Sequence, residues 1–378
     1  MIYLDNAATS FPKPSNVYYE VLNCMKNYAA NPGRSSHDMS LKASKKIAEA
    51  RGEIGSLFNI DNPFNIVFTV NATEAINIAI KGIINKGDHV ISTVIEHNSV
   101  LRPLNYLENQ GAEVSLINVD EYGFIKLEEL KSKIKQNTKL IVINHGSNVL
   151  GTVQNLDEIG SIAKEKGIVF MVDASQTAGV FDIDVKKSNI GLLAFPGHKG
   201  LLGPQGTGAL YIQDGIDLKE FISGGTGSNS SEMVQPNFLP DKFESGTLNT
   251  PGIAGLCEGI KFIRKTGISN IKKQEENLTE YLLQELKKLT TVKIYGLMDS
   301  KNRSSVVSIN IGNMDSAKVG YILNKNGIAV RTGFHCAPLI HKVIGTEKFG
   351  TVRISLGYFN TFDDIEKLID AIKYLGNN

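Results

Sequence analysis

The 378-residue chain has little of what marks a secreted, membrane or nucleic-acid-binding protein. Its three cysteines, Cys24, Cys257 and Cys336, are too few for a disulfide framework and indicate a reducing compartment. No apolar run approaches the ~20 residues that a membrane helix needs, and the opening MIYLDNAATS lacks the basic and apolar parts of a signal peptide. A net charge of +1 gives no electrostatic attraction for nucleic acid or an anionic membrane. We therefore expect a cytoplasmic protein that binds neither nucleic acid nor membrane.

Short apolar runs alternate with amphipathic segments through the first two thirds of the chain. The runs predict strands at 66–70, 89–94, 113–118, 139–144, 168–172, 192–195 and 209–212. Helical spacing of apolar residues predicts helices at 76–84, 99–109 and 156–166. Because strands this apolar have no face suited to water, the pattern predicts an α/β fold with a mainly parallel sheet covered by helices on both sides. Such sheets bind ligands beyond the carboxyl ends of their strands.

The alternation of predicted strands and helices ends after residue 218, where a glycine- and serine-rich loop is followed by a helical pattern from 253 to 289. An alternating segment, Val306–Ile311, and a closing amphipathic helix at 363–375 complete this part. We therefore predict a large domain over residues 16–251 and a smaller α/β domain formed by residues 1–15 and 252–378.

Lys199 lies in the stretch FPGHKGLLGPQGTGALY, residues 195–211, among glycines and between two apolar runs. Glycines let the backbone approach a bound group closely. Dry surroundings lower the pKa of a lysine, so that its amine becomes a nucleophile able to form a Schiff base with an aldehyde. The alternative is an ordinary lysine in a glycine-rich hairpin.

Other polar residues follow the predicted strands. Asp173 ends one apolar run and is either a turn residue or a carboxylate paired with the pyridinium nitrogen of a heterocyclic cofactor. Asn71-Ala72-Thr73 stands between a strand and a helix, where backbone N–H groups form either an anion site or an ordinary helix cap. His198 could add a phosphate contact, and His97 could stack on a cofactor ring or be a satisfied polar residue.

The segment RTGFHCAPLIH near the C-terminus carries Cys336, with Arg331 five positions before it. A thiol near an arginine and a histidine has its thiolate favoured, although a small buried cysteine is the alternative. A metal site from His335, Cys336 and His341 lacks the ligand spacing of known zinc motifs, so we predict none. Arg353 is a candidate clamp for a substrate carboxylate or a member of a structural ion pair. The glycines after Lys199 precede a strand rather than a helix, which excludes a Rossmann fingerprint.

Taken in order, VDASQTAG, GHKGLLGPQGTGALY, FESGTLNT and RTGFHCA resemble the cysteine desulfurases, pyridoxal-phosphate enzymes of the class V aminotransferase group. The resemblance runs from YLDNAAT at the start to RISLGYFNT near the end. It implies a fold-type I architecture and a homodimer with active sites at the subunit interface.

The resemblance also implies roles for single residues. Lys199 would hold pyridoxal 5′-phosphate, Asp173 would pair with the ring nitrogen and His97 would stack on the ring. The remaining cofactor contacts would come from Ala72, Thr73, Asn148, Gln176, His198 and, from the partner subunit, Thr247. The substrate would be bound by Asn6, Asn148, Arg331 and Arg353. Cys336 would take the sulfur as a persulfide. The sequence departs from the family at Pro196, where many members have a serine or threonine that contacts the phosphate, and at Phe334, where many have histidine.

The function implied is conversion of L-cysteine to L-alanine, with the sulfur passed from Cys336 to an acceptor protein in iron–sulfur cluster assembly or thiolation. One alternative is a selenocysteine lyase acting on L-selenocysteine, or another fold-type I lyase or aminotransferase. An alternative of another class is a non-catalytic scaffold with a vestigial cofactor pocket.

Overall fold

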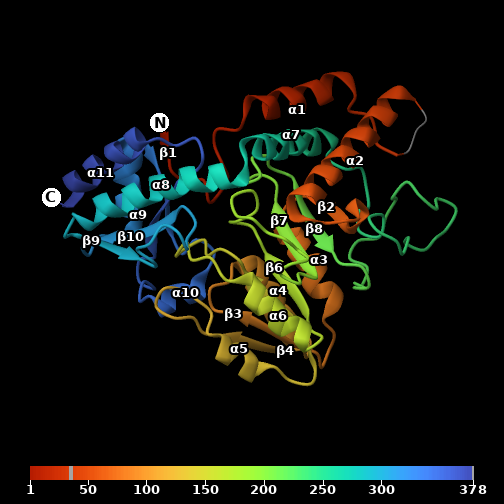
Figure 1. Ribbon diagram of the computed structural model, residues 1–378, viewed down its shortest axis with the longest axis horizontal. Coiled ribbons are helices and arrows are strands. Elements are labelled where there is room, and N and C mark those ends of the chain that lie inside the picture. The colour runs from red at the N-terminus through yellow and green to blue at the C-terminus, as the bar shows by residue number, and fades with distance from the viewer. Residues whose placement is uncertain (34–36, 377–378) are drawn as a thin grey trace.

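The computed structural model describes residues 1–33 and 37–376 (Figure 1). A seven-stranded sheet forms the centre of its larger part. In spatial order the strands are β2 (Ile66–Thr69), β8 (Gly208–Ile212), β7 (Leu192–Pro196), β6 (Val169–Asp173), β5 (Thr138–Asn144), β3 (His89–Thr93) and β4 (Glu113–Ile117). Only β8 runs antiparallel to its neighbours, and every other pair in this sheet is parallel. The predicted mainly parallel sheet is therefore confirmed.

Helices cover both faces of this sheet because successive side chains of a strand point to opposite faces. In β5, Ile141 and Ile143 pack into one core and Leu140 and Val142 into the other. The first core is covered by α2 (Asp38–Phe58), α5 (Leu127–Lys133), α6 (Leu156–Glu165) and α7 (Thr250–Thr266). The second is covered by α3 (Ala72–Ile83) and α4 (Asn98–Glu108). Outside them, α1 (Ser15–Asn27) packs along α7 (Figure 1).

The smaller part is built on a four-stranded antiparallel sheet. Its strands in spatial order are β12 (Arg331–Gly333), β13 (Thr351–Ser355), β10 (Val306–Ile311) and β9 (Val292–Tyr295). Its core is shared with α8 (Ile268–Lys287), α9 (Ser316–Lys325) and α11 (Phe362–Gly376), while α10 (Pro338–Val343) follows β12. The first strand, β1 (Ile2–Tyr3), pairs with β11 (Ile328–Ala329), which places the N-terminus on this part (Figure 1).

The two parts meet along α7 and α8. Ile253 and Ile260 of α7 belong to the core beneath the large sheet, whereas Leu278 and Leu282 of α8 belong to the core of the smaller part. A domain boundary at residues 251 and 252 stays a prediction, and this division of the cores favours a boundary inside α8. Within the described ranges, no helix is both long and apolar enough to cross a membrane. All three cysteines are free thiols.

Candidate active site

A pocket lies where β5, β6 and β7 end, at the sheet edge that the parallel topology predicts. It is lined by Asn71, Ala72, Thr73, His97, Ser99, Asn144, Asn148, Asp173, Ser175, Gln176, Pro196, His198 and Lys199. The structure thus brings together residues from five separate stretches of the chain, among them most of the predicted cofactor contacts. Asn144 and Ser99 were not predicted from the sequence.

Lys199 supplies an amine to this pocket. Burial lowers the pKa of Lys199 from 10.5 to about 8; Asp173 raises it, and Arg353 and Arg331 lower it. The backbone that carries the lysine is fixed by the N-terminal segment, because Ser10 Oγ donates to the Lys199 carbonyl at 2.8 Å and Thr9 Oγ1 to the His198 carbonyl at 3.0 Å. Such an amine is half neutral at pH 8, where an ordinary lysine is almost wholly charged, so it suits nucleophilic attack on an aldehyde.

Asp173 faces the same pocket from the end of β6. Its Oδ1 accepts hydrogen bonds from the backbone N–H of Ser175, at 2.9 Å, and from the Ser175 hydroxyl. With Oδ1 held in this way, Oδ2 is left for a ligand in the pocket. The Asp-x-Ser spacing is a signal that the sequence offered for Ser175, since aspartate commonly bonds the backbone two residues on.

The start of α3, where the sequence predicts an anion site, lies in the lining of this pocket. Asn71 caps the helix by accepting the Glu74 N–H at 2.9 Å, while the first-turn N–H groups of Ala72 and Thr73 have no partner inside the helix. His198 Nδ1 is buried beside this site with no partner in the described part of the chain. Burial lowers the pKa of His198 to about 4, with Lys199 and Lys13 adding to the effect, so the ring is neutral at pH 7.

His97 is the N-cap of α4. Its Nδ1 accepts the backbone N–H of Ser99 at 3.0 Å. Burial is the main cause that lowers the pKa of His97 to about 4, and Asp173 opposes it. Because Nδ1 is an acceptor, the neutral ring carries its proton on Nε2. A flat, neutral imidazole therefore borders the pocket that Lys199 also lines.

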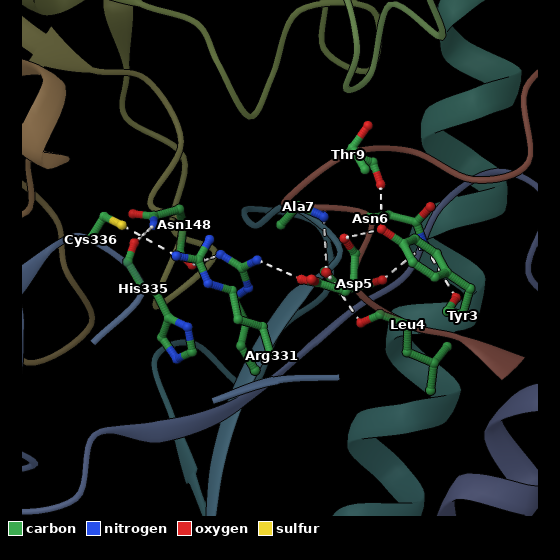
Figure 2. Close-up of polar contacts among 12 residues, drawn as sticks. Tyr3, Leu4, Asp5, Asn6, Ala7, Thr9, Asn148, Arg331, His335 and Cys336 are labelled. Atoms are coloured by element: carbon green, nitrogen blue, oxygen red, sulfur yellow. Dashed lines mark hydrogen bonds and ion pairs between the residues drawn. The ribbon is translucent and has the colours of Figure 1, made fainter. Parts of the chain in front are cut away.

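Cys336, Arg331 and Arg353 are not in the pocket lining, but Asn148, which is, donates a hydrogen bond to the carbonyl of His335, the residue directly before the thiol (Figure 2). Arg331 donates a hydrogen bond to Cys336 Sγ at 3.2 Å. Both residues come from the small sheet and the turn after it, so the thiol reaches the pocket from the smaller part of the molecule. His335, directly before the thiol, has a buried ring bonded to Thr351, and the His341 ring bonds Thr346.

Arg353 is fully buried and forms an ion pair with Asp5, with Nη2 of the arginine 2.7 Å from Asp5 Oδ1. Its Nη1 donates to the carbonyl of Asn148 at 3.3 Å, and its Nε has no partner within the described ranges. Burial lowers the pKa of Arg353 while Asp5 raises it. The arginine therefore has both a structural partner and an unused donor, and Asp5 is a residue that sequence reasoning missed.

The remaining predicted amides are engaged within the protein. Asn148 Nδ2 donates to the His335 carbonyl at 2.6 Å, which leaves a buried Oδ1 without a partner in the described chain (Figure 2). Gln176 Nε2 donates to the Ala7 carbonyl at 3.1 Å. Asn6 bonds Ser355 and Asn360 and lines a neighbouring cavity that Lys199 also borders.

One further predicted residue lies elsewhere. Thr247 is exposed and does not line the pocket of its own chain, so its contribution to a partner subunit's site stays a prediction. Among the described residues, the one group of three metal-ligating side chains that converges is Glu49, Cys257 and Glu258. Its carboxylates bond the amines of Lys46 and Lys261.

Comparison with known proteins gives the same result along the whole chain. Residues 2–368 match the family model of the class V aminotransferases. A probable cysteine desulfurase of Methanothermobacter thermautotrophicus is 38% identical over 98% of this chain and 94% of its own length. A cysteine desulfurase of Haloferax volcanii is 31% identical over 98% and 88% of the two chains. The apo structure of a cysteine desulfurase from Thermococcus onnurineus superimposes with a TM-score of 0.93 at 34% identity, covering 100% of this chain and 94% of that one.

The chain therefore belongs to the class V aminotransferase family. Within it, the chain belongs with the cysteine desulfurases. The resemblance stated from the sequence and the fold-type I α/β architecture are both confirmed.

Proposed function

We propose that this protein is a pyridoxal-phosphate-dependent cysteine desulfurase, which converts L-cysteine to L-alanine and takes the sulfur onto Cys336 as a persulfide. One observation carries the proposal: the Lys199 amine, the Asp173 carboxylate and the α3 anion site border one pocket, and the Cys336 thiol lies beside it. The family to which the chain belongs supports the same activity.

The residues present fit pyridoxal phosphate. The free N–H groups at the start of α3 and the unpartnered His198 Nδ1 suit its phosphate. Strand β8 packs closely against the start of α3. A Cβ on Gly208 would lie 2.7 Å from the backbone carbonyl carbon of Asn71, so only glycine fits there. Asp173 Oδ2 would hold the ring nitrogen, His97 would stack on the ring and Lys199 would bond the aldehyde.

When bound, pyridoxal phosphate supplies an electron sink that weakens the bonds to the substrate's α-carbon. Lys199 Nζ, in the neutral form that its lowered pKa of about 8 makes more accessible than in an ordinary lysine, would accept a proton from that carbon and return it later. Arg331 and Arg353 would orient the substrate, Arg353 through its unused Nε. Neutral His97 does not compete for these protons at pH 7.

Sulfur transfer falls to Cys336. Its thiolate would attack the sulfur of the bound cysteine, so that a sulfur–sulfur bond forms, the carbon–sulfur bond breaks and its electron pair stays with carbon. Protonation of that carbon completes alanine. The proton of the substrate thiol stays with the transferred sulfur, so the product on Cys336 is a persulfide. We propose that the persulfide then passes to an acceptor protein, that the enzyme is a homodimer with Thr247 reaching the partner's site, and that it works in the cytoplasm.

The test is to incubate the loaded enzyme with L-cysteine and to measure alanine together with Cys336 persulfide by peptide mass spectrometry. Cys336→Ala should abolish the persulfide and cut alanine formation, whereas Cys24→Ala, which removes a buried thiol that does not line the pocket, should retain both. L-selenocysteine is tested alongside L-cysteine, and activity on L-selenocysteine alone would indicate a selenocysteine lyase. Desulfuration of L-cysteine by Cys336→Ala at the wild-type rate would overturn the assigned role.

A further inference from the structure

Cys336 occupies a turn of unusual handedness. The N–H of Ala337 donates to the carbonyl of Phe334 at 2.9 Å, which closes a four-residue β-turn. Both central residues have positive φ, 50° at His335 and 61° at Cys336. Two central residues with positive φ define a type I′ turn, a conformation dominated by glycine, asparagine and aspartate. Neither His335 nor Cys336 is of that kind, so the surrounding structure must hold the turn in place.

The His335 side chain supplies one such hold. It is 2% exposed, and its Nε2 lies 2.9 Å from the hydroxyl of Thr351. Thr351 begins β13 and pairs in register with Gly333 of β12, the strand that carries Arg331. The imidazole therefore ties the turn back to the sheet that carries the partner of the thiol. Burial, with Arg353, His341 and Arg331, lowers the pKa of His335 to about 2, so this ring has no acid–base role near pH 7.

The left-handed turn also directs two carbonyl groups at the larger part of the molecule. The carbonyl of His335 accepts Asn148 Nδ2 at 2.6 Å, and the carbonyl of Cys336 accepts the N–H of Asn98 at 2.7 Å. Rotation of either residue to negative φ would swing these carbonyls away and move the sulfur from Arg331. One backbone conformation thus fixes both the docking of the turn and the place of the thiol.

We propose that His335 is a positioning residue for Cys336: its imidazole, held by Thr351, keeps the turn left-handed, so that Sγ stays at Arg331 beside the pocket. The inference deepens the proposed function and rests on the role of Cys336 as sulfur acceptor. The role proposed for His335 is conformational, because its ring acts on Cys336 through the backbone.

Three variants at one position separate this role from the alternatives. His335→Ala should lower kcat on L-cysteine by about tenfold or more, since displacement of a reacting group by ~1 Å costs up to a hundredfold. His335→Gly and His335→Asn should retain more activity than His335→Ala, because glycine and asparagine adopt positive φ at little cost. A packing role predicts the opposite order, with alanine better than glycine. A chemical role of the ring predicts that all three variants are equally impaired.

Thr351 provides a second test that leaves His335 in place. Thr351→Val keeps the side-chain shape and removes the hydroxyl, so it should impair kcat like His335→Ala, while Thr351→Ser should behave as the wild type. In the His335→Gly background Thr351→Val should have no further effect, because no imidazole remains to be held. An equal loss from Thr351→Val in both backgrounds would overturn the proposal.

A measurement that does not depend on enzyme turnover, the chemical labelling of Cys336, distinguishes failure of this inference from failure of the proposed function. The rate at which iodoacetamide labels Cys336 should stay at the wild-type value in His335→Gly and Thr351→Ser, and depart from it by about threefold or more in His335→Ala and Thr351→Val. Buried Cys24 and Cys257 should stay unlabelled, which shows that each variant is folded. Uniform Cys336 labelling across all four variants would reject the inference even if the wild type desulfurates cysteine. Absence of persulfide in the wild type would reject the proposed function alone.

Discussion

The backbone N–H of Asn98 donates to the carbonyl oxygen of Cys336 at 2.7 Å. Asn98 follows His97, the N-cap of α4, so one helix start carries a flat imidazole to the pocket lining and holds the turn that contains Cys336. The thiol belongs to the smaller part of the molecule and the pocket to the larger one. If Cys336 takes the sulfur as proposed, sulfur transfer depends on the contact between the two parts, and a change that loosens this contact should impair sulfur transfer before cofactor binding.

The Lys199 amine should titrate far below an ordinary lysine. Burial lowers its pKa to about 8, so in the cofactor-free protein the reactive neutral form should appear as the pH rises through about 8 rather than through 10.5. Acetylation by acetic anhydride, read at the Lys199 peptide by mass spectrometry, measures this midpoint, and exposed Lys318 on α9 reports the intrinsic reactivity of the reagent.

Removal of the Asp173 charge should change the pKa of Lys199, measured on the same peptide. The carboxylate raises the pKa of Lys199, so Asp173→Asn should move the labelling midpoint below that of the wild type. A midpoint that stays above pH 10 in the wild type, or rises in Asp173→Asn, would contradict the electrostatics described for this pocket.

Asp5→Asn should destabilise the protein through Arg353. The arginine side chain is 1% exposed and its partner 22%, so loss of the carboxylate leaves a buried charge without compensation. We expect a fall of about 1–3 kcal/mol in the free energy of unfolding, measured in urea. Asp363→Asn breaks an exposed ion pair with Lys367 and should cost less than about 0.5 kcal/mol. Equal effects of the two variants would show that the buried pair has no special weight.

Much of the pocket could be predicted from the sequence because parallel strands place their carboxyl ends at one edge. Asp173 and the segment at Asn71 each follow an apolar run, so locating the strands was enough to bring these groups together. The helix-forming stretches of α1 and α2 gave no such signal. Tyr18, Leu22 and Met25 of α1 remain exposed, so its apolar residues do not mark one buried face.

What the sequence could not supply is pairing across the fold. Asp5 meets Arg353, and Asn148 meets the carbonyl of His335, over separations that no local pattern encodes. The handedness of the turn at Cys336 was hidden for a related reason, since neither His335 nor Cys336 belongs to the residue types that signal positive φ.

Pro196→Ser should tighten binding of pyridoxal phosphate. Pro196 lines the pocket beside the start of α3, where a serine hydroxyl could donate to the phosphate as in many members of the family. One added hydrogen bond is worth about 1 kcal/mol, or roughly fivefold in the dissociation constant. Absorbance titration of the cofactor-free protein measures it, and Pro196→Ala, which changes the backbone in the same way without a hydroxyl, is the control. Equal affinities of the two variants would refute the prediction.

Glu275 should make the stability of the protein depend on pH. This buried carboxyl on α8 lines the cavity beside Lys199 and accepts the Ser305 hydroxyl at 2.8 Å. Burial raises its pKa from 4.5 to about 7, so between these values the folded protein holds a proton that the unfolded chain has lost. The contribution of Glu275 to stability therefore falls as the pH rises from 4.5 toward 7.

Glu275→Gln stays neutral at every pH and should escape this loss. Relative to the wild type, its free energy of unfolding should rise by about 3 kcal/mol between pH 4.5 and 7.5, since each unit of pKa shift corresponds to about 1.4 kcal/mol. Urea unfolding at several pH values gives the difference, and Glu280→Gln, on the same helix with a hydrogen bond to Gln284, gives the baseline for an acid-to-amide change outside the cavity. A Glu275→Gln difference that is flat across this range would show that Glu275 ionises as readily in the folded protein as in the unfolded chain.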